Sequence, residues 1–201
     1  MDTPPAQSRL ILCGSLSLHP VSLGAAMHLA GYQALGLPFT YVPFKVVDLA
    51  GAIAGMRALG IRGFGVSMPY KQAIIPLLDA LDVQASRIGA VNTVVNEEGG
   101  ITGHNTDAYG AVRAIEEQIH LTGQRVLLLG AGGAARAVAH GVRDKGAELT
   151  IANRDRGKAE ALALETGAHA AGLDEVERAG EYAIVINATS CGMGEVDRAS
   201  P

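Results

Sequence analysis

The chain is poor in aromatic residues: Trp is absent, and Phe, Tyr and Trp together make up 4% of its 201 residues. Its core must therefore be built from Ala, Leu, Val and Ile, which suits closely packed layers of helix and sheet. Hydrophobic residues make up 48% and charged residues 18% of the chain. This balance predicts a globular protein and excludes an intrinsically disordered one.

Clustered positive charge and long apolar runs are missing as well. The formal net charge is −4, and no block of Lys and Arg is interleaved with aromatic residues, so nucleic acid is excluded as a main partner. No apolar run approaches the ~20 residues that span a bilayer. The start of the chain, Met1 to Arg9, is polar and lacks the pattern of a signal peptide, so we expect a cytoplasmic protein without a membrane partner.

Cysteine and histidine show no ligand-like grouping. Cys13 and Cys191 lie far apart in apolar or Gly-rich surroundings, and we expect two buried, reduced thiols. The spacing of His19, His28 and His104 matches no metal-ligand pattern, so no metal site is predicted.

The chain alternates between strand-like and helix-like segments, a rhythm typical of a parallel sheet flanked by helices. Gly99-Gly100 predicts a hairpin between two of the strands. Strands are predicted at Arg9–Gly14, Phe39–Phe44, Gly63–Met68, Ala90–Asn96, Ile101–His104, Arg125–Leu129, Glu148–Ala152 and Ala183–Asn187. Helices are predicted at Leu23–Leu35, Asp48–Leu59, Gln72–Leu81 and Asp107–Ile119.

The second strand–helix series begins with a glycine-rich turn. Gly130, Gly132, Gly133 and Ala134 follow an apolar strand and open a helix, which is the arrangement of a dinucleotide-binding fingerprint. Gly130 permits the tight turn, Gly132 lets the backbone approach a pyrophosphate, and the helix N-terminus offers free N–H groups to it.

The residues after the next strand indicate the type of cofactor. NAD-binding proteins usually carry Asp or Glu there to bind the ribose diol, whereas this chain has Asn153 and Arg154, with Arg156 and Lys158 nearby. Arg can form a bidentate pair with a 2′-phosphate, which favours NADP. The alternative is a solvated basic start of a helix.

Four polar segments of the first half follow or precede predicted strands, where ligands of α/β proteins bind. They are 15–22, Ser67–Lys71, Gly89–Thr93 and Gly103–Asp107.

These segments and the glycine-rich turn resemble shikimate dehydrogenase. The family carries six motifs in a fixed order, and this chain has a match to each of them. The matches are Pro69-Tyr70-Lys71, Gly89-Ala90-Val91-Asn92-Thr93, Gly103-His104-Asn105-Thr106-Asp107-Ala108-Tyr109-Gly110, Gly130 to Arg136, Asn153-Arg154 and Asn187-Ala188-Thr189-Ser190.

The resemblance implies a reaction and a set of roles. Lys71 matches the family's catalytic lysine and Asp107 its partner aspartate, while Asn92 matches a residue that binds substrate hydroxyls. Thr189 and Ser190 match positions near the cofactor. The chemistry implied is reversible hydride transfer between NADPH and 3-dehydroshikimate/shikimate, a cyclic polyhydroxy carboxylate, with Lys71 moving a proton at the reacting oxygen or holding that oxygen electrostatically.

The substrate side departs from the family pattern. Of the two serines that normally hold the substrate carboxylate, only Ser22 is retained, and Ser15 with Ser17 forms an alternative pair in another register. Ser67 retains one hydroxyl before the proline. The chain also ends at Pro201, several dozen residues earlier than is usual in the family, so we expect a fragment.

The sequence therefore predicts an α/β protein with an N-terminal substrate domain, residues 1–121, and an incomplete Rossmann-type NADP-binding domain, residues 122–201, with the active site in the cleft between them. Two alternatives stay open: a quinate/shikimate-type dehydrogenase with shifted substrate preference, as in shikimate dehydrogenase-like paralogues, and a catalytically silent NADP-binding paralogue. The oligomeric state is monomer or homodimer.

Overall fold

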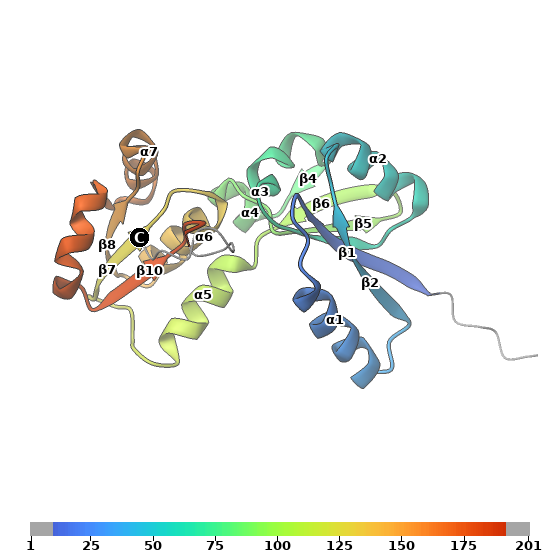
Figure 1. Cartoon of the computed structure of the whole chain (residues 1–201), viewed down its shortest axis with the longest axis horizontal. Coiled ribbons are helices and arrows are strands. Elements are labelled where there is room, and N and C mark those ends of the chain that lie inside the picture. Colours follow the sequence, from blue (N-terminus) through green and yellow to red (C-terminus); the bar gives the residue numbers. More distant parts are fainter. Residues whose placement is uncertain (1–9, 192–201) are drawn as a thin grey trace, which may run out of the picture. The chain divides into compact units, whose positions relative to one another are not determined.

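The computed structural model describes residues 10–191, which divide into two compact units (Figure 1). The first unit holds residues 10–87 and 91–105, and the second holds residues 88–90 and 106–191. Each unit is built on one sheet.

The first unit contains a six-stranded mixed sheet of order β2-β1-β3-β5-β6-β4. Strand β1 pairs in parallel with β2 and β3, whereas β5 is antiparallel to both β3 and β6. The strands are β1 (Ile11–Ser17), β2 (Phe39–Lys45), β3 (Gly63–Val66), β4 (Ala80–Leu81), β5 (Thr93–Glu97) and β6 (Gly100–His104).

Two helices cover opposite faces of this sheet. Because β2 and β3 flank β1 on opposite sides, right-handed crossovers place α1 (Ser22–Ala34) and α2 (Leu49–Leu59) on opposite faces, as Figure 1 shows. Asp48 caps α2 by accepting a hydrogen bond from the Gly51 N–H at 2.9 Å, and Gly60 ends it in the left-handed region with φ 63°.

The core of the first unit lies under α2. Ile53 and Met56 of α2 pack on alternate residues of the strands, among them Leu16, Phe64 and Val94. The face covered by α1 is held differently, because the His28 ring stacks on Tyr41 with centroids 4.3 Å apart.

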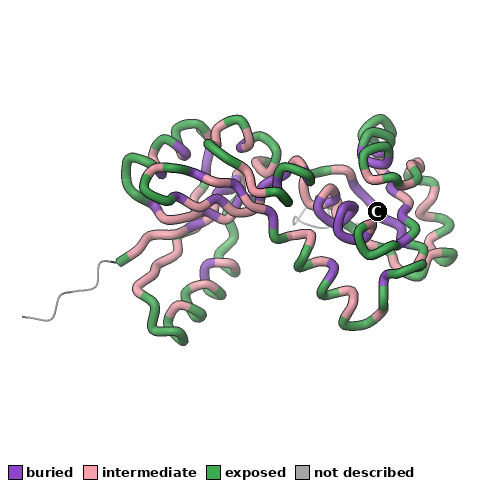
Figure 2. Tube along the Cα trace, turned by 180° about the vertical axis from the view of Figure 1, so that it is seen from behind, coloured by how far each residue is buried: buried purple, intermediate pink, exposed green. Residues whose placement is uncertain are grey.

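The second unit contains a parallel sheet of order β10-β7-β8-β9. Its central strands, β7 and β8, are buried on both faces: Val126 and Leu128 pack toward the helices α6 and α7, and Leu127 and Leu129 belong to a second cluster. Such burial explains why Arg125–Leu129 is an unbroken apolar run after its first residue. Figure 2 shows the buried residues concentrated in α6 and these strands. The elements are β7 (Arg125–Leu129), α6 (Gly133–Asp144), β8 (Glu148–Ala152), α7 (Arg156–Thr166), β9 (His169–Ala171), the 3-10 helix η2 (Leu173–Glu181) and β10 (Ile184–Asn187).

Most predicted elements are confirmed, and β7 and β8 have the predicted bounds. The helix predicted at Gln72–Leu81 is wrong: this segment forms α3 (Tyr70–Ala73), the 3-10 turn η1 (Ile75–Leu77) and β4. Pro76 has no N–H to donate and its ring clashes with the preceding helical turn, so the helix cannot continue. A short helix, α4 (Val83–Ile88), follows.

The helix α5 (Asp107–Glu116) lies in the second unit, although the predicted domain boundary was Leu121–Gln124. The reason is close packing on α6: a Cβ added to Gly141 would lie 2.8 Å from the Val112 side chain. Val112 accordingly belongs to the core of the second unit.

Cys13 and Cys191 are free thiols, as expected, and both are half-buried rather than buried. Over residues 10–191, the helices are too short or too polar to cross a bilayer.

We expect Gly14→Ala to destabilise the first unit. A Cβ on this buried strand residue would lie 2.3 Å from the Val42 carbonyl oxygen and 2.7 Å from the Phe44 ring. Such overpacking lowers the free energy of unfolding by about 1–3 kcal/mol or more. Gly31→Ala in α1, where the Cβ meets open space, is the control and should raise it by about 0.5–1 kcal/mol. Equal denaturant midpoints for the two variants would contradict this packing.

Candidate functional site

The candidate substrate residues lie at one end of the first sheet, where its parallel strands β1 and β3 have their carboxyl ends. Parallel strands β1 and β3 end on the same side, and the antiparallel strand β5 begins there. Ser22 follows β1, Ser67 and Lys71 follow β3, and Asn92 precedes β5. The topology therefore brings these four predicted residues to the same side of the first unit.

Lys71 is held at the start of α3, directly after β3. The Ser67 N–H donates to the Leu16 carbonyl at 2.9 Å, and the Tyr70 N–H donates to the Ser67 carbonyl at 2.9 Å, which fixes the turn. The Tyr70 hydroxyl donates to the Val46 carbonyl at 2.6 Å, and its ring packs on the core. Tyr70 is thus a packing residue, while Lys71 is half-buried.

A backbone hydrogen bond joins the Lys71 segment to the residue directly before Asn92. The Val91 N–H donates to the Lys71 carbonyl at 2.7 Å, and the Asn92 N–H donates to the His104 carbonyl at 3.0 Å. The Thr93 hydroxyl donates to the Asn92 amide oxygen at 3.0 Å and so orients the amide. An amide held in this way is suited to binding a hydroxyl group.

The serines of the first loop have different surroundings. Ser22 is exposed at the first position of α1, whose N-cap Val21 supplies no side-chain hydrogen bond. In the alternative pair, Ser15 interacts with the Tyr41 hydroxyl, and burial raises the pKa of Tyr41. Ser17 is 6% exposed, and its hydroxyl has no hydrogen-bond partner within residues 10–191.

His104 is a structural residue of the first unit. Its Nδ1 atom lies 2.9 Å from Asp82 Oδ2, and Asp82 Oδ1 accepts from the Ala85 N–H at 2.6 Å at the start of α4. Within residues 10–191, no group of three or more His, Cys, Asp or Glu is placed to hold a metal ion.

The glycine-rich turn of the second unit has the geometry that a dinucleotide requires. Gly130 has φ 112°, and its N–H donates to the Ala152 carbonyl at 2.8 Å. Gly132 is the N-cap of α6, which has no side-chain cap, so the first-turn N–H groups are available to a phosphate. Within residues 10–191, apart from its chain neighbours and its own helix backbone, no atom lies within 4 Å of a Cβ added at Gly132, which leaves room for a pyrophosphate beside Gly133 and Ala134.

The end of β8 carries the predicted 2′-phosphate residues. The Asn153 side chain donates to the Asp155 carbonyl at 2.9 Å, and the Asp155 carboxylate accepts from the Lys158 N–H at the N-cap of α7. Arg156 is paired with Glu160 at 3.0 Å. Arg154 is exposed, and across the described part of the chain its guanidinium forms no ion pair or hydrogen bond.

Thr189 and Ser190 follow β10, beside the glycine-rich turn. The Ala188 N–H donates to the Leu129 carbonyl at 2.9 Å, and the Thr189 hydroxyl donates to Asn187 Oδ1 at 2.7 Å. A Cβ on Gly130 would lie 3.0 Å from the Ala188 carbonyl oxygen. The carboxyl ends of β7, β8 and β10 therefore bring the predicted cofactor residues to one side of the second sheet.

Asp107 is the first residue of α5 and belongs to the second unit, whereas Lys71 belongs to the first. Both side chains are half-buried. Their pairing stays a prediction.

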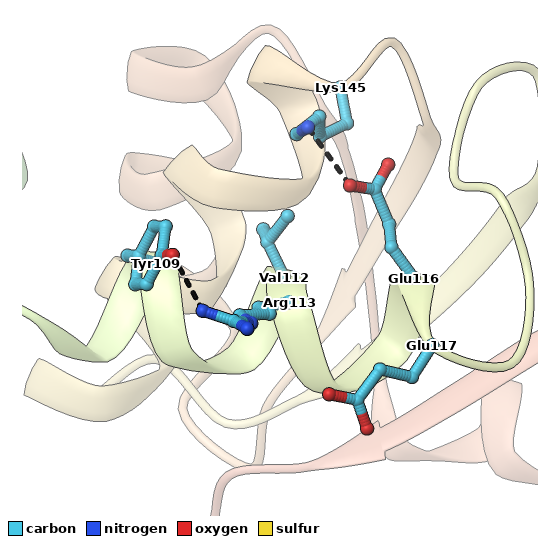
Figure 3. A pocket seen from close by; sticks show the side chains of 6 residues that line it. All are labelled: Tyr109, Val112, Arg113, Glu116, Glu117 and Lys145. Atoms are coloured by element: carbon cyan, nitrogen blue, oxygen red, sulfur yellow. Dashed lines mark hydrogen bonds and ion pairs between the residues drawn. The ribbon is translucent and has the colours of Figure 1, made fainter.

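A separate hollow lies on the second unit between α5 and the end of α6 (Figure 3). It encloses about 300 Å³. Two contacts lie along its wall: Lys145 pairs with Glu116 at 2.9 Å, and Arg113 donates to the Tyr109 hydroxyl at 3.0 Å. None of the predicted site residues lines it, so it is not part of the candidate site.

Two residues received no individual role from the sequence. Asn105 is polar but only 6% exposed, and its place in the Gly-x-Asn-Thr-Asp motif was the available signal. Arg136 ends the glycine-rich motif, and its guanidinium reaches Ile88 and Glu165. The two partners of Arg136 lie 48 and 29 residues away in the sequence, so no local pattern could indicate these contacts.

Comparison with family models shows two matches in chain order. Residues 19–94 match the shikimate dehydrogenase substrate binding domain, and residues 112–197 match shikimate / quinate 5-dehydrogenase.

Individual relatives agree with these matches. The shikimate dehydrogenase (NADP(+)) of Geobacillus kaustophilus is 45% identical over 181 residues, which is 86% of this chain and 66% of the relative. A crystal structure of a shikimate dehydrogenase in complex with NADP+ has a TM-score of 0.88 and 39% identity, covering 96% of this chain and 71% of that one. The shikimate 5-dehydrogenase of Thermus thermophilus, crystallised with NADP(H) and shikimate, has a TM-score of 0.81 and 40% identity, covering 90% and 69%.

Substitutions at two glycines should separate stability from dinucleotide binding. Gly130→Ala introduces strain at φ 112° and should lower the free energy of unfolding by about 1–3 kcal/mol. Gly132→Ala should lower stability less, because its Cβ meets open space and only the N-cap preference for Gly over Ala is lost, but it should weaken dinucleotide binding about tenfold or more by blocking the phosphate. Thermal melting and dinucleotide titration test both, and unaltered affinity in Gly132→Ala would remove this turn from the cofactor site.

Proposed function

The chain belongs to the shikimate dehydrogenase family, and we propose that it transfers hydride reversibly between NADPH and a ring ketone of the 3-dehydroshikimate/shikimate type. The chain spans about two thirds of the length of the curated relative, 66%, so the proposal concerns the activity of the protein as a whole. In this proposal the first unit binds a cyclic polyhydroxy carboxylate and the second binds NADP. The protein would be a cytoplasmic oxidoreductase of the shikimate pathway.

The observation that carries the proposal is the grouping of Lys71 and Asn92 at one side of the first sheet. Their backbones are joined through Val91, whose N–H donates to the Lys71 carbonyl at 2.7 Å. An ammonium group and an oriented amide are therefore held in one region, where one can bind a reacting oxygen and the other a neighbouring hydroxyl.

The bound cofactor would supply the hydride acceptor or donor. In the direction of reduction, the carbonyl carbon gains the hydride and its oxygen gains a proton. Lys71 donates that proton or stabilises the developing negative charge on the oxygen, and in oxidation it accepts the proton. Asp107 is the proposed partner of Lys71. Asn92 and Ser67 would hold the substrate hydroxyls, and Ser22 the carboxylate.

The proposed cofactor contacts follow the geometry of the second unit. The first turn of α6, with Gly132, Gly133 and Ala134, would hold the pyrophosphate. Asn153 and Arg154 would hold the 2′-phosphate of NADP, since the strand end carries no carboxylate for a ribose diol. Thr189 and Ser190 would lie near the cofactor.

A second candidate is a quinate/shikimate-type activity with a shifted substrate preference. It is supported by the first loop, where Ser22 is exposed at the start of α1 while Ser17 is buried with its hydroxyl unpartnered over residues 10–191. A silent paralogue is disfavoured, because Lys71 and Asp107 are both present.

Lys71→Ala should lower kcat by about 10²–10⁴-fold, because the variant loses the group that moves or stabilises charge at the reacting oxygen. The dissociation constant for NADP should stay unchanged, since the proposed contact of Lys71 is with the reacting oxygen and not with the phosphate groups of the cofactor. Steady-state kinetics and NADP titration provide the measurements. Lys145→Ala, which removes a lysine paired with Glu116, is the control. Wild-type turnover in Lys71→Ala would exclude this lysine from the mechanism.

Arg154→Ala should weaken NADP binding by about 10–100-fold and leave NAD binding nearly unchanged, because only NADP has a 2′-phosphate for the guanidinium to bind. Arg156→Ala is a matched control, since Arg156 is already paired with Glu160. Titration of both dinucleotides compares the variants. An equal loss of affinity for NADP and NAD in Arg154→Ala would overturn the 2′-phosphate assignment.

A further inference from the structure

Two sequence motifs that are separate in the chain meet through one side chain. Arg136, the last residue of the glycine-rich motif, lies in the first turns of α6. Its Nε atom donates to the Ile88 carbonyl at 2.5 Å, directly before the Gly89–Thr93 motif. One terminal nitrogen donates to both carboxylate oxygens of Glu165 on α7, at 2.6 and 2.8 Å.

The guanidinium is held in place by its acidic partner. Glu165 also lies 2.9 Å from Nε2 of His140, one helical turn after Arg136, and His140 is buried. Burial alone would raise the pKa of Glu165, but the hydrogen bonds from Arg136 and His140 outweigh it and hold this pKa below its usual range. Glu165 is therefore a carboxylate at neutral pH. The Arg136 guanidinium is occupied by hydrogen bonds to Ile88 and Glu165, so we do not assign it to a cofactor phosphate.

The segment that Arg136 reaches is packed as well as hydrogen-bonded. Ile88 and Ala90 are fully buried in a small cluster with Ala137 of α6, and Ala108 packs against it. Between them, Gly89 has φ 65°, and a Cβ there would lie 2.9 Å from the Arg136 terminal nitrogen. Glycine is thus required at position 89 both by its backbone conformation and by the closeness of the guanidinium.

The anchored segment leads directly into the substrate residues. Val91 comes next, is fully buried, and donates its N–H to the Lys71 carbonyl at 2.7 Å. The Asn92 N–H donates to the His104 carbonyl at 3.0 Å, and the Asn92 carbonyl accepts from the Val66 N–H at 2.7 Å. The residue that follows the anchored segment, Val91, is therefore hydrogen-bonded to the Lys71 backbone and directly precedes Asn92.

We propose that Arg136 is a positioning residue for substrate binding, which acts by fixing the Ile88 carbonyl and, through the Gly89–Ala90 turn, the backbone that orients Asn92 and Lys71. Its guanidinium is engaged by Ile88 and Glu165, so we assign it no direct contact with substrate or cofactor. The proposal rests on the proposed function, because Asn92 and Lys71 have their substrate roles only there. Whether Arg136 holds the Ile88–Ala90 backbone in place can be tested without measuring any enzymatic activity.

The test compares Arg136→Gln with Arg143→Gln in the full chain. Arg143 is a matched control on the same helix: its Nε donates to the Thr166 carbonyl at 3.1 Å and its Nη1 to the Ala147 carbonyl at 2.5 Å, so it too joins α6 to its surroundings through carbonyl groups. A merely structural arginine at 136 would give the same results as Arg143→Gln. Arg136→Lys retains the positive charge but lacks the planar guanidinium whose several N–H groups bind both the Ile88 carbonyl and the Glu165 carboxylate.

Hydrogen–deuterium exchange provides the readout that is independent of catalysis. In Arg136→Gln, we expect the Val91 and Asn92 amides to exchange about tenfold or more faster than in wild type, while Arg143→Gln leaves them protected. Arg136→Lys should fall between the two. Equal protection of these amides in Arg136→Gln and Arg143→Gln would overturn the proposal, whatever the activity of the chain.

Kinetics provide the second readout. KM for shikimate should rise about fivefold or more in Arg136→Gln, with the dissociation constant for NADP within about twofold of wild type, and Arg143→Gln should change neither. An unchanged KM in Arg136→Gln would refute the substrate role of the anchor. Lack of shikimate turnover in the wild-type chain would instead contradict the proposed function, and the exchange result would still decide whether Arg136 holds the segment.

Discussion

Parallel strand pairing is the constraint on which both halves of the candidate site depend. In the second unit, β7 pairs in parallel with β8 and β10, so three strands end on one side of the sheet. The loops that follow them carry the glycine-rich turn, Arg154 and Thr189. In the first unit, the parallel strands β1 and β3 end at one edge of the sheet. The antiparallel strand β5 begins at this same edge, and Asn92 directly precedes it.

Strand pairing positions the functional loops only approximately, and close packing of the backbone at glycine residues fixes them more tightly. Gly130 fits because a side chain there would press on Ala188, and Gly89 fits because Arg136 lies over it. In both places a glycine brings a functional loop against its support without a side chain between them. The motifs that identify the family thus combine residues expected to contact ligand with residues that only permit a close approach.

The parts of the fold that could be predicted from the sequence have strong local signals. The strand Arg125–Leu129 is an apolar run followed by glycine, and the structure confirms it with the same bounds. The helix expected over Gln72–Leu81 is wrong because Pro76 interrupts it, a local signal that outweighs the apolar pattern around it. The short strands β4 and β9 have too few residues for a periodic pattern.

The same distinction between local and distant signals applies to the residues of the candidate site. Lys71, Asn92 and the cofactor residues could be named from motifs and strand ends, because each lies beside a recognisable turn. Arg136 could not be given a role, since its partners Ile88 and Glu165 are 48 and 29 residues away in the chain. Likewise, α5 follows the strands of the first unit in sequence but packs on α6, where Gly141 lies against Val112, a residue far from it in the sequence.

We expect these loops to serve NADP-dependent oxidation of shikimate, and initial rates of dinucleotide reduction would show whether they do. Reduction of NADP and of NAD would be followed with shikimate and with quinate as substrates. We predict that shikimate reduces NADP, with NADP strongly preferred over NAD. Reduction of NAD in preference to NADP, or binding of NADP without oxidation of either substrate, would contradict the proposed function.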